Sequence, residues 1–423
     1  MRVNVLSMII CSCFMLLGSL GHAQDDLVLP DFIAKEDVVD VDCKCLEKEV
    51  KYSKAEQKYI DILWEESMLY LRGLAEALTK NPEEGGCRQS DVAVFETLGG
   101  VKRMCIMDRR DMQLLVKQIY QILYNQEAAK KCFAARKEVD WLYSPGGKLE
   151  EQSPVAKWMK RTTFEEFFDT KVTNDSVKAY GKVLTDNFYD IVTGEQVVTP
   201  PNFPYDVSAR SLPNLWASVG WFPMYAEDSE RNKRNFMEVR GGYAYGEILG
   251  HWGLLRIDEI GGHKVGAEVG MTVQMVNSLY PYHNHSISEM YYTMTTPACP
   301  DQFKTFAARD INKQVKTVGQ TEDEWIVEFD AGMQNEFRQW SSGSNTKNNL
   351  VYFYENTIHA FDVDGSCVED PEKMALVSVW ARSDAHEIFN DYGGTRLCEC
   401  ADKPNTPAVR GKKVRCQLNK LSY

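Results

Sequence analysis

Residues 280–292, YPYHNHSISEMYY, hold two of the seven histidines of this chain, with a carboxylate and two tyrosines directly behind them. Successive side chains of a β-strand point to opposite faces of the sheet. A strand, or two strands joined by a tight bend, can therefore turn the odd-numbered side chains inward: His283, His285, Glu289 and Tyr291. Two imidazoles, a carboxylate and a phenol that converge on one point are suited to bind a divalent cation. The stretch therefore predicts strands that enclose a metal site.

The remaining ligand should come from a later strand. Outside this motif, four histidines follow residue 23, namely His251, His263, His359 and His386. His359 ends the apolar run LVYFYENTIH at residues 350–359, and a β-barrel places a late strand beside the metal-bearing one. His359 is therefore predicted as the fourth ligand, with a buried structural histidine as the alternative. The other three histidines are expected to have structural roles.

Composition sets broad bounds on the fold and the partners. The chain has 423 residues, enough for two domains, and its 44% hydrophobic and 26% charged content suits a globular protein. Its formal net charge of −13 argues against a nucleic-acid partner, because no basic face can easily dominate it.

The N-terminus has the pattern of an export signal. Arg2 precedes an apolar run over residues 5–20, and Gly21-His22-Ala23 has the small-x-small pattern of a cleavage site before Gln24. A membrane anchor is the alternative, but the run is short for a membrane span. We therefore expect residues 1–23 to be a signal peptide cleaved near Ala23, leaving an exported protein without a membrane partner.

Cysteine usage agrees with export. Ten of the twelve cysteines follow the predicted cleavage site, and an even number in an exported chain suggests disulfide bonds. Two CxC pairs, Cys43/Cys45 and Cys398/Cys400, lack the CxxC spacing of zinc ribbons. Structural bridges are therefore the expected role, and the sequence leaves their connectivity open.

The first half of the chain has helical periodicity. Apolar residues recur every three or four positions over residues 54–80, and Asp108 can cap a second helix that runs towards residue 137. Further helical segments are predicted from Pro154 and over residues 175–192. Residues 24–195 are therefore predicted to form a mainly α-helical domain.

The pattern changes at VVTPPNFP, residues 197–204, where three prolines stiffen the chain. Short β-rich runs and paired glycines follow, which suggests a sandwich or barrel. The candidate strands span residues 244–249, 268–276, 289–295, 324–329, 350–354 and 374–382. We therefore predict a β-domain over residues 196–400, followed by a basic, cysteine-bearing tail at 401–423.

The spacing His-x-His-x3-Glu resembles the first half of the metal site of cupins. The match is partial: Thr295 and Thr296 stand where a glycine is expected, and Tyr354-Glu355-Asn356 replaces the Pro-x-Gly before the second histidine. The resemblance implies an α+β protein with a C-terminal cupin β-barrel, a double-stranded β-helix. Tyr291 narrows it, because His283-Asn284-His285 followed by Glu289-Met290-Tyr291 resembles the cupin-type dimethylsulfoniopropionate (DMSP) lyases. The export signal and the helical first half resemble the periplasmic DddY branch of that family.

This resemblance implies an activity and a set of roles. The substrate would be a small zwitterion, DMSP, which a carbon–sulfur lyase splits by β-elimination into dimethyl sulfide and acrylate. A divalent metal, usually zinc, would be held by His283, His285, Glu289 and His359, a ligand set that also accepts Fe²⁺, Mn²⁺ or Ni²⁺. Tyr291 would be the base.

Tyr280 occupies the position of a second active-site tyrosine in related cupin lyases. Tyr280 is even-numbered, whereas the inward-facing residues of this strand are odd-numbered. It therefore faces inward only if Pro281 interrupts the regular alternation of the strand. The sulfonium group could rest on aromatic faces, and candidates on or near predicted barrel strands are Trp340, Tyr352, Phe353, Tyr354 and Trp380.

The residues make this chemistry physically reasonable. A dication near a phenol favours the phenolate, which can act as a general base. Two other classes stay open: a cupin iron dioxygenase, and an exported cupin that binds a ligand without catalysis. A base at position 291 is needed for elimination and not for oxygen activation, so it favours the lyase. The role of the helical domain and the oligomeric state stay open.

Overall fold

The computed structural model describes residues 27–79, 92–96, 100–134, 215–216, 219, 221–223, 243–276, 278–285, 287–293, 303–307, 315–320, 324–330, 333–334, 350–355, 357–369, 375–383, 396–397 and 413–419. The predicted signal peptide, the helices expected from Pro154 and over residues 175–192, Trp340, His386 and the Cys398/Cys400 pair lie outside these ranges. No helix in the described part of the chain is both long and apolar enough to cross a membrane.

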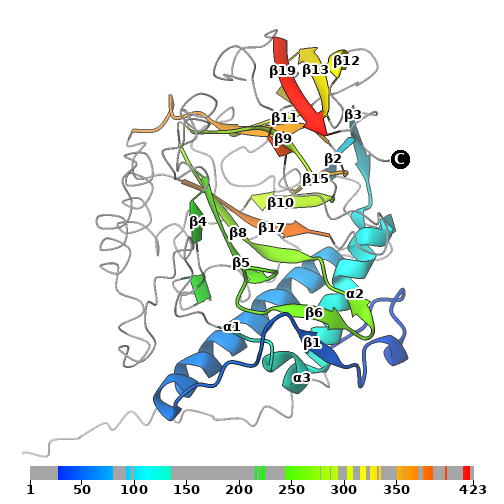
Figure 1. Ribbon diagram of the computed structural model, residues 1–423, viewed down its shortest axis with the longest axis vertical. Helices are drawn as coiled ribbons and strands as arrows, with labels where there is room; N and C mark the ends of the chain where they lie inside the picture. Colours follow the sequence, from blue (N-terminus) through cyan, green and yellow to red (C-terminus); the bar gives the residue numbers. More distant parts are fainter. Residues whose placement is uncertain are drawn as a thin grey trace, which may run out of the picture.

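Within these ranges, the largest sheet has eight strands in the order β3-β2-β15-β10-β17-β8-β5-β4 (Figure 1). Its strands are β2 (Val92–Glu96), β3 (Gly100–Met104), β4 (Trp221–Pro223), β5 (Tyr243–Leu249), β8 (Glu268–Met275), β10 (Glu289–Thr293), β15 (Leu350–Phe353) and β17 (Ala375–Arg382). Neighbouring strands are antiparallel except for the parallel pair β2 and β15.

A second sheet of five described strands has the order β14-β11-β16-β9-β18. Its strands are β9 (Ser278–Asn284), β11 (Phe303–Ala307), β14 (Met333–Gln334), β16 (His359–Val363) and β18 (Arg396–Leu397). A hydrogen bond from Gln274 Nε2 to the Phe361 carbonyl, at 3.2 Å, joins β8 of the first sheet to β16 of the second. The two sheets are therefore in contact at these strands.

Two smaller three-stranded sheets complete the described β-structure. One contains β1 (Cys43–Cys45), β6 (Ile257–Ile260) and β7 (His263–Lys264), and the other contains β12 (Val315–Gln320), β13 (Glu324–Asp330) and β19 (Lys413–Asn419). β1 comes from the N-terminal segment and β19 from the C-terminal tail, so both ends of the described chain are tied into sheets.

The described helices include α1 (Lys54–Thr79), α2 (Arg110–Tyr124) and the short α3 (Gln126–Lys130), with 3₁₀ turns η2 (Lys35–Asp37) and η4 (Ile106–Asp108). The predicted periodicity of α1 is confirmed, because the residues of its predicted inner face are buried: Ile60, Leu63, Ser67, Leu71, Leu74 and Leu78.

The predicted extent and cap of the second helix are wrong. Asp108 closes a 3₁₀ turn instead of capping α2, whose N-cap position is Arg109. The helix ends at Tyr124, because Asn125 leaves the helical conformation and its side-chain amide donates to the carbonyls of Val38 and Gln121. The chain then turns towards β1, which a helix running to residue 137 would prevent.

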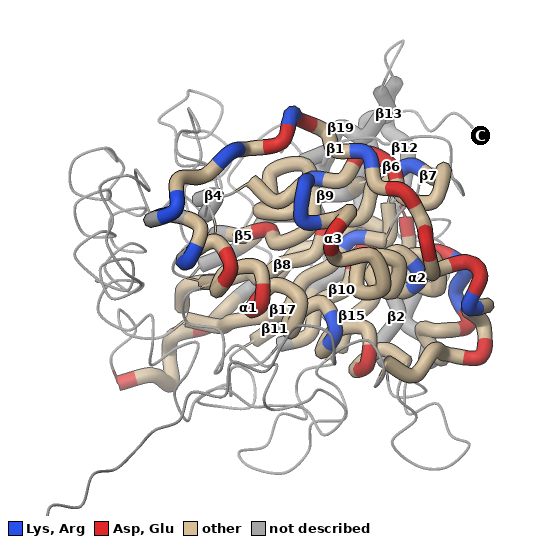
Figure 2. Tube along the Cα trace, turned by 90° about the horizontal axis from the view of Figure 1, so that it is seen from below, with Lys and Arg blue, Asp and Glu red and all other residues tan. Residues whose placement is uncertain are grey.

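The two faces of the eight-stranded sheet have different environments. Met290, Tyr292 and Tyr352 belong to one hydrophobic cluster with the buried faces of α1 and α2. The Tyr70 hydroxyl of α1 donates to the carbonyl of Gly270 on β8, at 2.6 Å. Charged positions follow the outer segments around α1, β6 and α2, whereas the central strands are mostly uncharged (Figure 2). The helices therefore cover one face, and the opposite face points towards the second sheet.

Two features of the described structure bear on the predicted organisation. The predicted run 350–359 is split: β15 ends at Phe353, and His359 begins β16 in the other sheet. β2 and β3, which come from the predicted helical domain, extend the large sheet, and α1 and α2 share one core with it. The described residues thus form an α+β protein with mainly antiparallel sheets.

A disulfide bond joins Cys45 of β1 to Cys132, 87 residues later, and confirms the predicted use of cysteines as bridges. Cys105 and Cys367 are also disulfide-bonded. Cys43 carries a free thiol whose pKa is raised to about 11, first by burial. One member of the first CxC pair is therefore bridged and the other is not.

This asymmetry predicts unequal effects of two substitutions. Closing a loop of this length restricts the unfolded chain, so Cys45→Ser should lower the free energy of unfolding by about 2–5 kcal/mol. Cys43→Ser is the matched control and should change it by less than about 1 kcal/mol. Denaturant unfolding of the two variants checks this, and equal losses would contradict a stabilising role for the bridge.

Candidate metal centre

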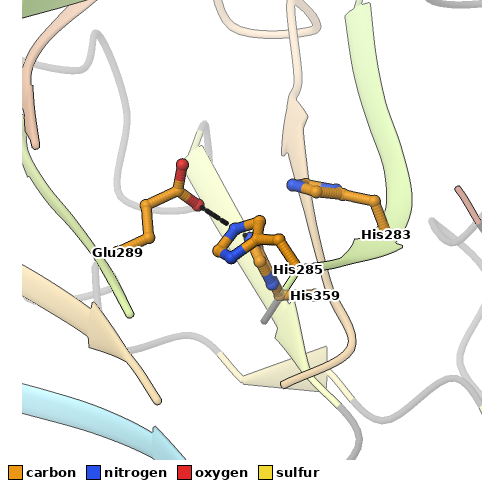
Figure 3. Close-up of side chains that lie close together, drawn as sticks. All are labelled: His283, His285, Glu289 and His359. Atoms are coloured by element: carbon orange, nitrogen blue, oxygen red, sulfur yellow. Dashed lines mark hydrogen bonds and ion pairs between the residues drawn. The ribbon is translucent and has the colours of Figure 1, made fainter. Parts of the chain in front are cut away.

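Four buried side chains converge between the two sheets: His283, His285, Glu289 and His359. Each offers one ligand atom, and these atoms all lie within 4.8 Å of one another. In Figure 3 the three imidazoles gather opposite the carboxylate of Glu289. The structure therefore brings together the four residues predicted from the sequence.

The motif reaches this arrangement by spanning both sheets. His283 lies on β9, directly opposite His359 on the antiparallel strand β16. The chain then leaves the second sheet, passes His285 and enters β10 of the large sheet at Glu289. Of the two arrangements predicted, a single strand or two strands joined by a bend, the second is therefore correct. The bend between β9 and β10 makes the imidazoles and the carboxylate face each other.

Tyr280 faces the same site because β9 contains a bulge. Tyr280 pairs with Phe361 of β16, and His283 pairs with His359. Between these two pairs β9 therefore contains one residue more than β16. An extra residue in one strand shifts its alternation by one position. The Tyr280 ring lies 4.2 Å from that of His283, and the irregularity at Pro281 that its inward placement required is present.

Backbone carbonyls fix the orientation of two histidines. His285 Nδ1 lies 2.6 Å from the Ile287 carbonyl oxygen, and His359 Nδ1 lies 2.8 Å from that of Thr357. A carbonyl only accepts, so each Nδ1 carries a proton, and in the neutral form of the ring the lone pair of Nε2 points to the other side. These two Nε2 atoms lie 2.9 and 3.1 Å from the same oxygen, Glu289 Oε2. Either a proton or a metal ion must lie between these atoms, and with the rings neutral the donor set fits a divalent cation.

The other carboxylate oxygen is held by the large sheet. Glu289 Oε1 accepts hydrogen bonds from Trp380 Nε1 at 2.6 Å and from Arg382 Nε at 3.2 Å. Burial raises the pKa of Glu289, but its neighbours His285, Arg382 and His359 together lower it well below its usual value. Burial also lowers the pKa of His359, despite the opposing effect of Glu289. A carboxylate and a neutral imidazole are the forms that bind metals.

Three tyrosines line the site beside these ligands. The hydroxyl of Tyr291 lies 3.3 Å from that of Tyr243, whose ring stacks on Tyr280 at 4.2 Å. Burial, followed by the negative charge of Glu289, raises the pKa of Tyr291 well above its ordinary value. Burial likewise raises the pKa of Tyr243 and brings that of Tyr280 above its ordinary value. Even with Arg382 nearby, all three phenols keep their protons unless a further positive charge is added.

The structure also sorts the other sequence candidates. Phe353 stacks on His359 at 4.0 Å, and Trp380 binds Glu289, so both belong to the site. Tyr352 and Tyr354 are in the hydrophobic cluster on the helix side. His251 and His263 are exposed and lie outside the ligand cluster.

Sequence reasoning missed Tyr243 and Arg382. Tyr243 begins β5, which pairs with β8 and has no neighbour in the motif along the chain. Arg382 is the one charged residue of the buried strand β17. A single charge in such a strand could have indicated that Arg382 has a buried, charged partner. Both residues reach the site only through the order of strands in the sheet.

The fold and the site define an α+β protein with a candidate mononuclear metal centre between two antiparallel sheets. No family model matches the chain. It is 57% identical over 395 residues to dimethylsulfoniopropionate lyase DddY of Shewanella woodyi, covering 93% of this chain and 95% of that protein. The chain therefore belongs to the DddY family of DMSP lyases.

Solved structures give much weaker likenesses. DMSP lyase DddQ from Ruegeria pomeroyi DSS-3 has a TM-score of 0.28 at 11% identity, covering 54% of this chain and 80% of that one. A chain from the crystal structures of the DMSP lyases RdDddP and RnDddQII has a TM-score of 0.26 at 9% identity, covering 58% of this chain and 100% of that one.

Proposed function

We propose that this protein is a metal-dependent DMSP lyase, a carbon–sulfur lyase that releases dimethyl sulfide and acrylate. The observation that carries the proposal is the 57% identity to a DddY lyase across 93% of the chain. The convergence of three histidines and Glu289 supports it, because the proposed elimination needs a positive centre beside the substrate.

The proposed ligands of the metal are His283, His285, Glu289 and His359. Zinc is the proposed ion, since it suits imidazole and carboxylate donors, although Fe²⁺, Mn²⁺ and Ni²⁺ suit them too. When bound, such a dication withdraws charge from the substrate's carboxylate and stabilises the negative charge that develops as the neighbouring carbon loses its proton.

Tyr291 is the proposed base. As the phenolate, it takes a proton from the carbon next to the substrate's carboxylate. The electron pair of that C–H bond becomes the carbon–carbon double bond, and the C–S bond breaks with its electrons moving to sulfur. Tyr291 ends protonated, and the neutral sulfide needs no acid to leave. Burial raises the pKa of Tyr291, and a cation bound in the site would favour its phenolate form.

Tyr280 and Tyr243 have a proposed role in binding the sulfonium. Their rings stack beside the ligand cluster, and both side chains are buried. A sulfonium against an aromatic face is attracted by about 0.5–2 kcal/mol, which orients the leaving group away from the carboxylate end.

The proposed location is the periplasm, after removal of residues 1–23 as a signal peptide near Ala23. The proposed layout keeps residues 24–195 as a mainly helical part, 196–400 as a cupin-type β-part and 401–423 as a tail. The location is supported by the match to a DddY lyase, because an export signal before a helical first half is the layout that resembles the periplasmic DddY branch.

The test is gas release by purified, metal-analysed protein. With DMSP, we expect dimethyl sulfide by gas chromatography and close to one divalent ion per chain by elemental analysis. Removal of the ion by a chelator should abolish release, and added Zn²⁺ should restore it. An absence of dimethyl sulfide from the metal-loaded protein would overturn the proposal, and undiminished release by the stripped protein would overturn its metal dependence.

A further inference from the structure

A buried carboxylate on helix α2 lies under the strands that carry the site. Asp111, in the first turn of α2, is 1% exposed. Its Oδ2 accepts hydrogen bonds from the Tyr352 hydroxyl at 2.5 Å and the Ser383 hydroxyl at 3.0 Å, and its Oδ1 pairs with Arg109 Nε at 3.2 Å. One oxygen therefore connects the end of strand β15 to the residue that follows β17.

The same contact extends to the start of β10. The backbone N–H of Ser383 donates to the carbonyl of Ser288 at 3.1 Å, and Ser288 directly precedes Glu289. In the sheet, Glu289 lies opposite Phe353 on one side and Arg382 on the other. Asp111 thus connects the ends of β15 and β17, and through Ser383 the start of β10, next to Glu289.

Because successive side chains of a strand point to opposite faces, the contacts of Asp111 on the helix side affect residues on the metal side of the sheet. Tyr352 and Ser383 point towards α2, so their neighbours Phe353 and Arg382 point to the opposite face. There Phe353 stacks on His359 at 4.0 Å, and Arg382 donates to Glu289 Oε1 at 3.2 Å. Each hydroxyl bound by Asp111 therefore belongs to a residue adjacent to one that contacts a candidate metal ligand.

We propose that Asp111 is a positioning residue for the metal centre: by fixing the ends of β15 and β17 from the helix side, it sets where Phe353 and Arg382 hold His359 and Glu289. This inference rests on the proposed metal site and gives α2 a role in it. Removing the carboxylate leaves two buried hydroxyls without their acceptor, and the strands shift to regain partners. The ligands then lose the geometry that the ion requires.

The experiment measures metal release rather than turnover. Zn²⁺-loaded full-length protein is mixed with excess chromophoric chelator, well below the unfolding temperature, and the dissociation rate and Zn²⁺ affinity are recorded. Asp111→Ala should release Zn²⁺ about ten-fold faster and bind it about ten-fold more weakly, at the low end of effects of groups that support metal ligands. Asp111→Asn keeps one acceptor oxygen and should fall between Asp111→Ala and the wild type.

The matched control is Tyr120→Phe. Tyr120 lies on the same helix, is buried, and donates its hydroxyl to the Val28 carbonyl at 3.1 Å, away from the site. It should lower the unfolding temperature yet release Zn²⁺ at the wild-type rate. If Asp111→Ala fails to fold, Tyr352→Phe and Ser383→Ala, which each remove one of the two hydroxyl bonds, should speed release in the same direction.

The outcomes separate this inference from the proposed function. Wild-type protein must bind one Zn²⁺ and His359→Ala none; if the wild type binds none, the metal site itself fails and the inference with it. If the wild type binds and the Asp111, Tyr352 and Ser383 variants release Zn²⁺ no faster than Tyr120→Phe, Asp111 only stabilises the fold and the inference is wrong.

Discussion

Tyr291→Phe should lose almost all turnover while keeping its metal. The substitution removes only a hydroxyl, from a residue that supplies none of the four ligand atoms. General-base catalysis contributes about 10²–10⁴-fold to a rate, so kcat should fall by that range. Dimethyl sulfide release at saturating DMSP measures the fall, and elemental analysis should still find one ion per chain.

The neighbouring tyrosine supplies the control for this variant. Tyr292 lies on the same strand but belongs to the hydrophobic cluster on the helix side. Tyr292→Phe should therefore retain turnover close to that of the wild type, within the loss expected from any change in stability. A Tyr291→Phe protein with nearly wild-type kcat would remove this hydroxyl from the mechanism.

His359→Ala should lose the metal and, with it, turnover. His359 is fully buried, and its Nε2 lies 3.1 Å from Glu289 Oε2 at the centre of the cluster. Groups that merely support ligands change metal affinity by about 10–100-fold, so loss of a ligand should exceed about 100-fold. Equilibrium Zn²⁺ titration of the stripped protein checks the affinity, and dimethyl sulfide release should fall below detection.

An exposed histidine gives the comparison. His263 is on β7, in a sheet that contributes nothing to the cluster, and His263→Ala should bind Zn²⁺ like the wild type. His359→Ala protein with unchanged stoichiometry and affinity would show that this imidazole is structural, the alternative that the sequence left open.

Much of the β-structure was predictable because it depends on short-range patterns. β8, β10, β15 and β17 begin or end within two residues of the predicted runs, since alternating or continuous apolar side chains fit a buried strand whatever its neighbours are. α1 was predictable for the same reason, from a stripe repeated over a long segment. The end of α2 was not, because it depends on Asn125 finding the Val38 carbonyl far away along the chain.

The residues of the candidate site likewise fall into two groups, those predictable from the sequence and those placed only by the tertiary structure. By itself, the sequence determined which side chains bring metal-binding and proton-accepting chemistry, because donor type and local spacing are written in the motif around His283, His285 and Glu289. Only the tertiary structure decided that His359 opens a separate strand opposite His283, and that a bulge turns Tyr280 to the same face. It alone brought Tyr243, Arg382 and Asp111 to their places. The physical reason is that strand order and register arise from pairings between distant segments, and a local pattern carries no information about which segment will lie alongside.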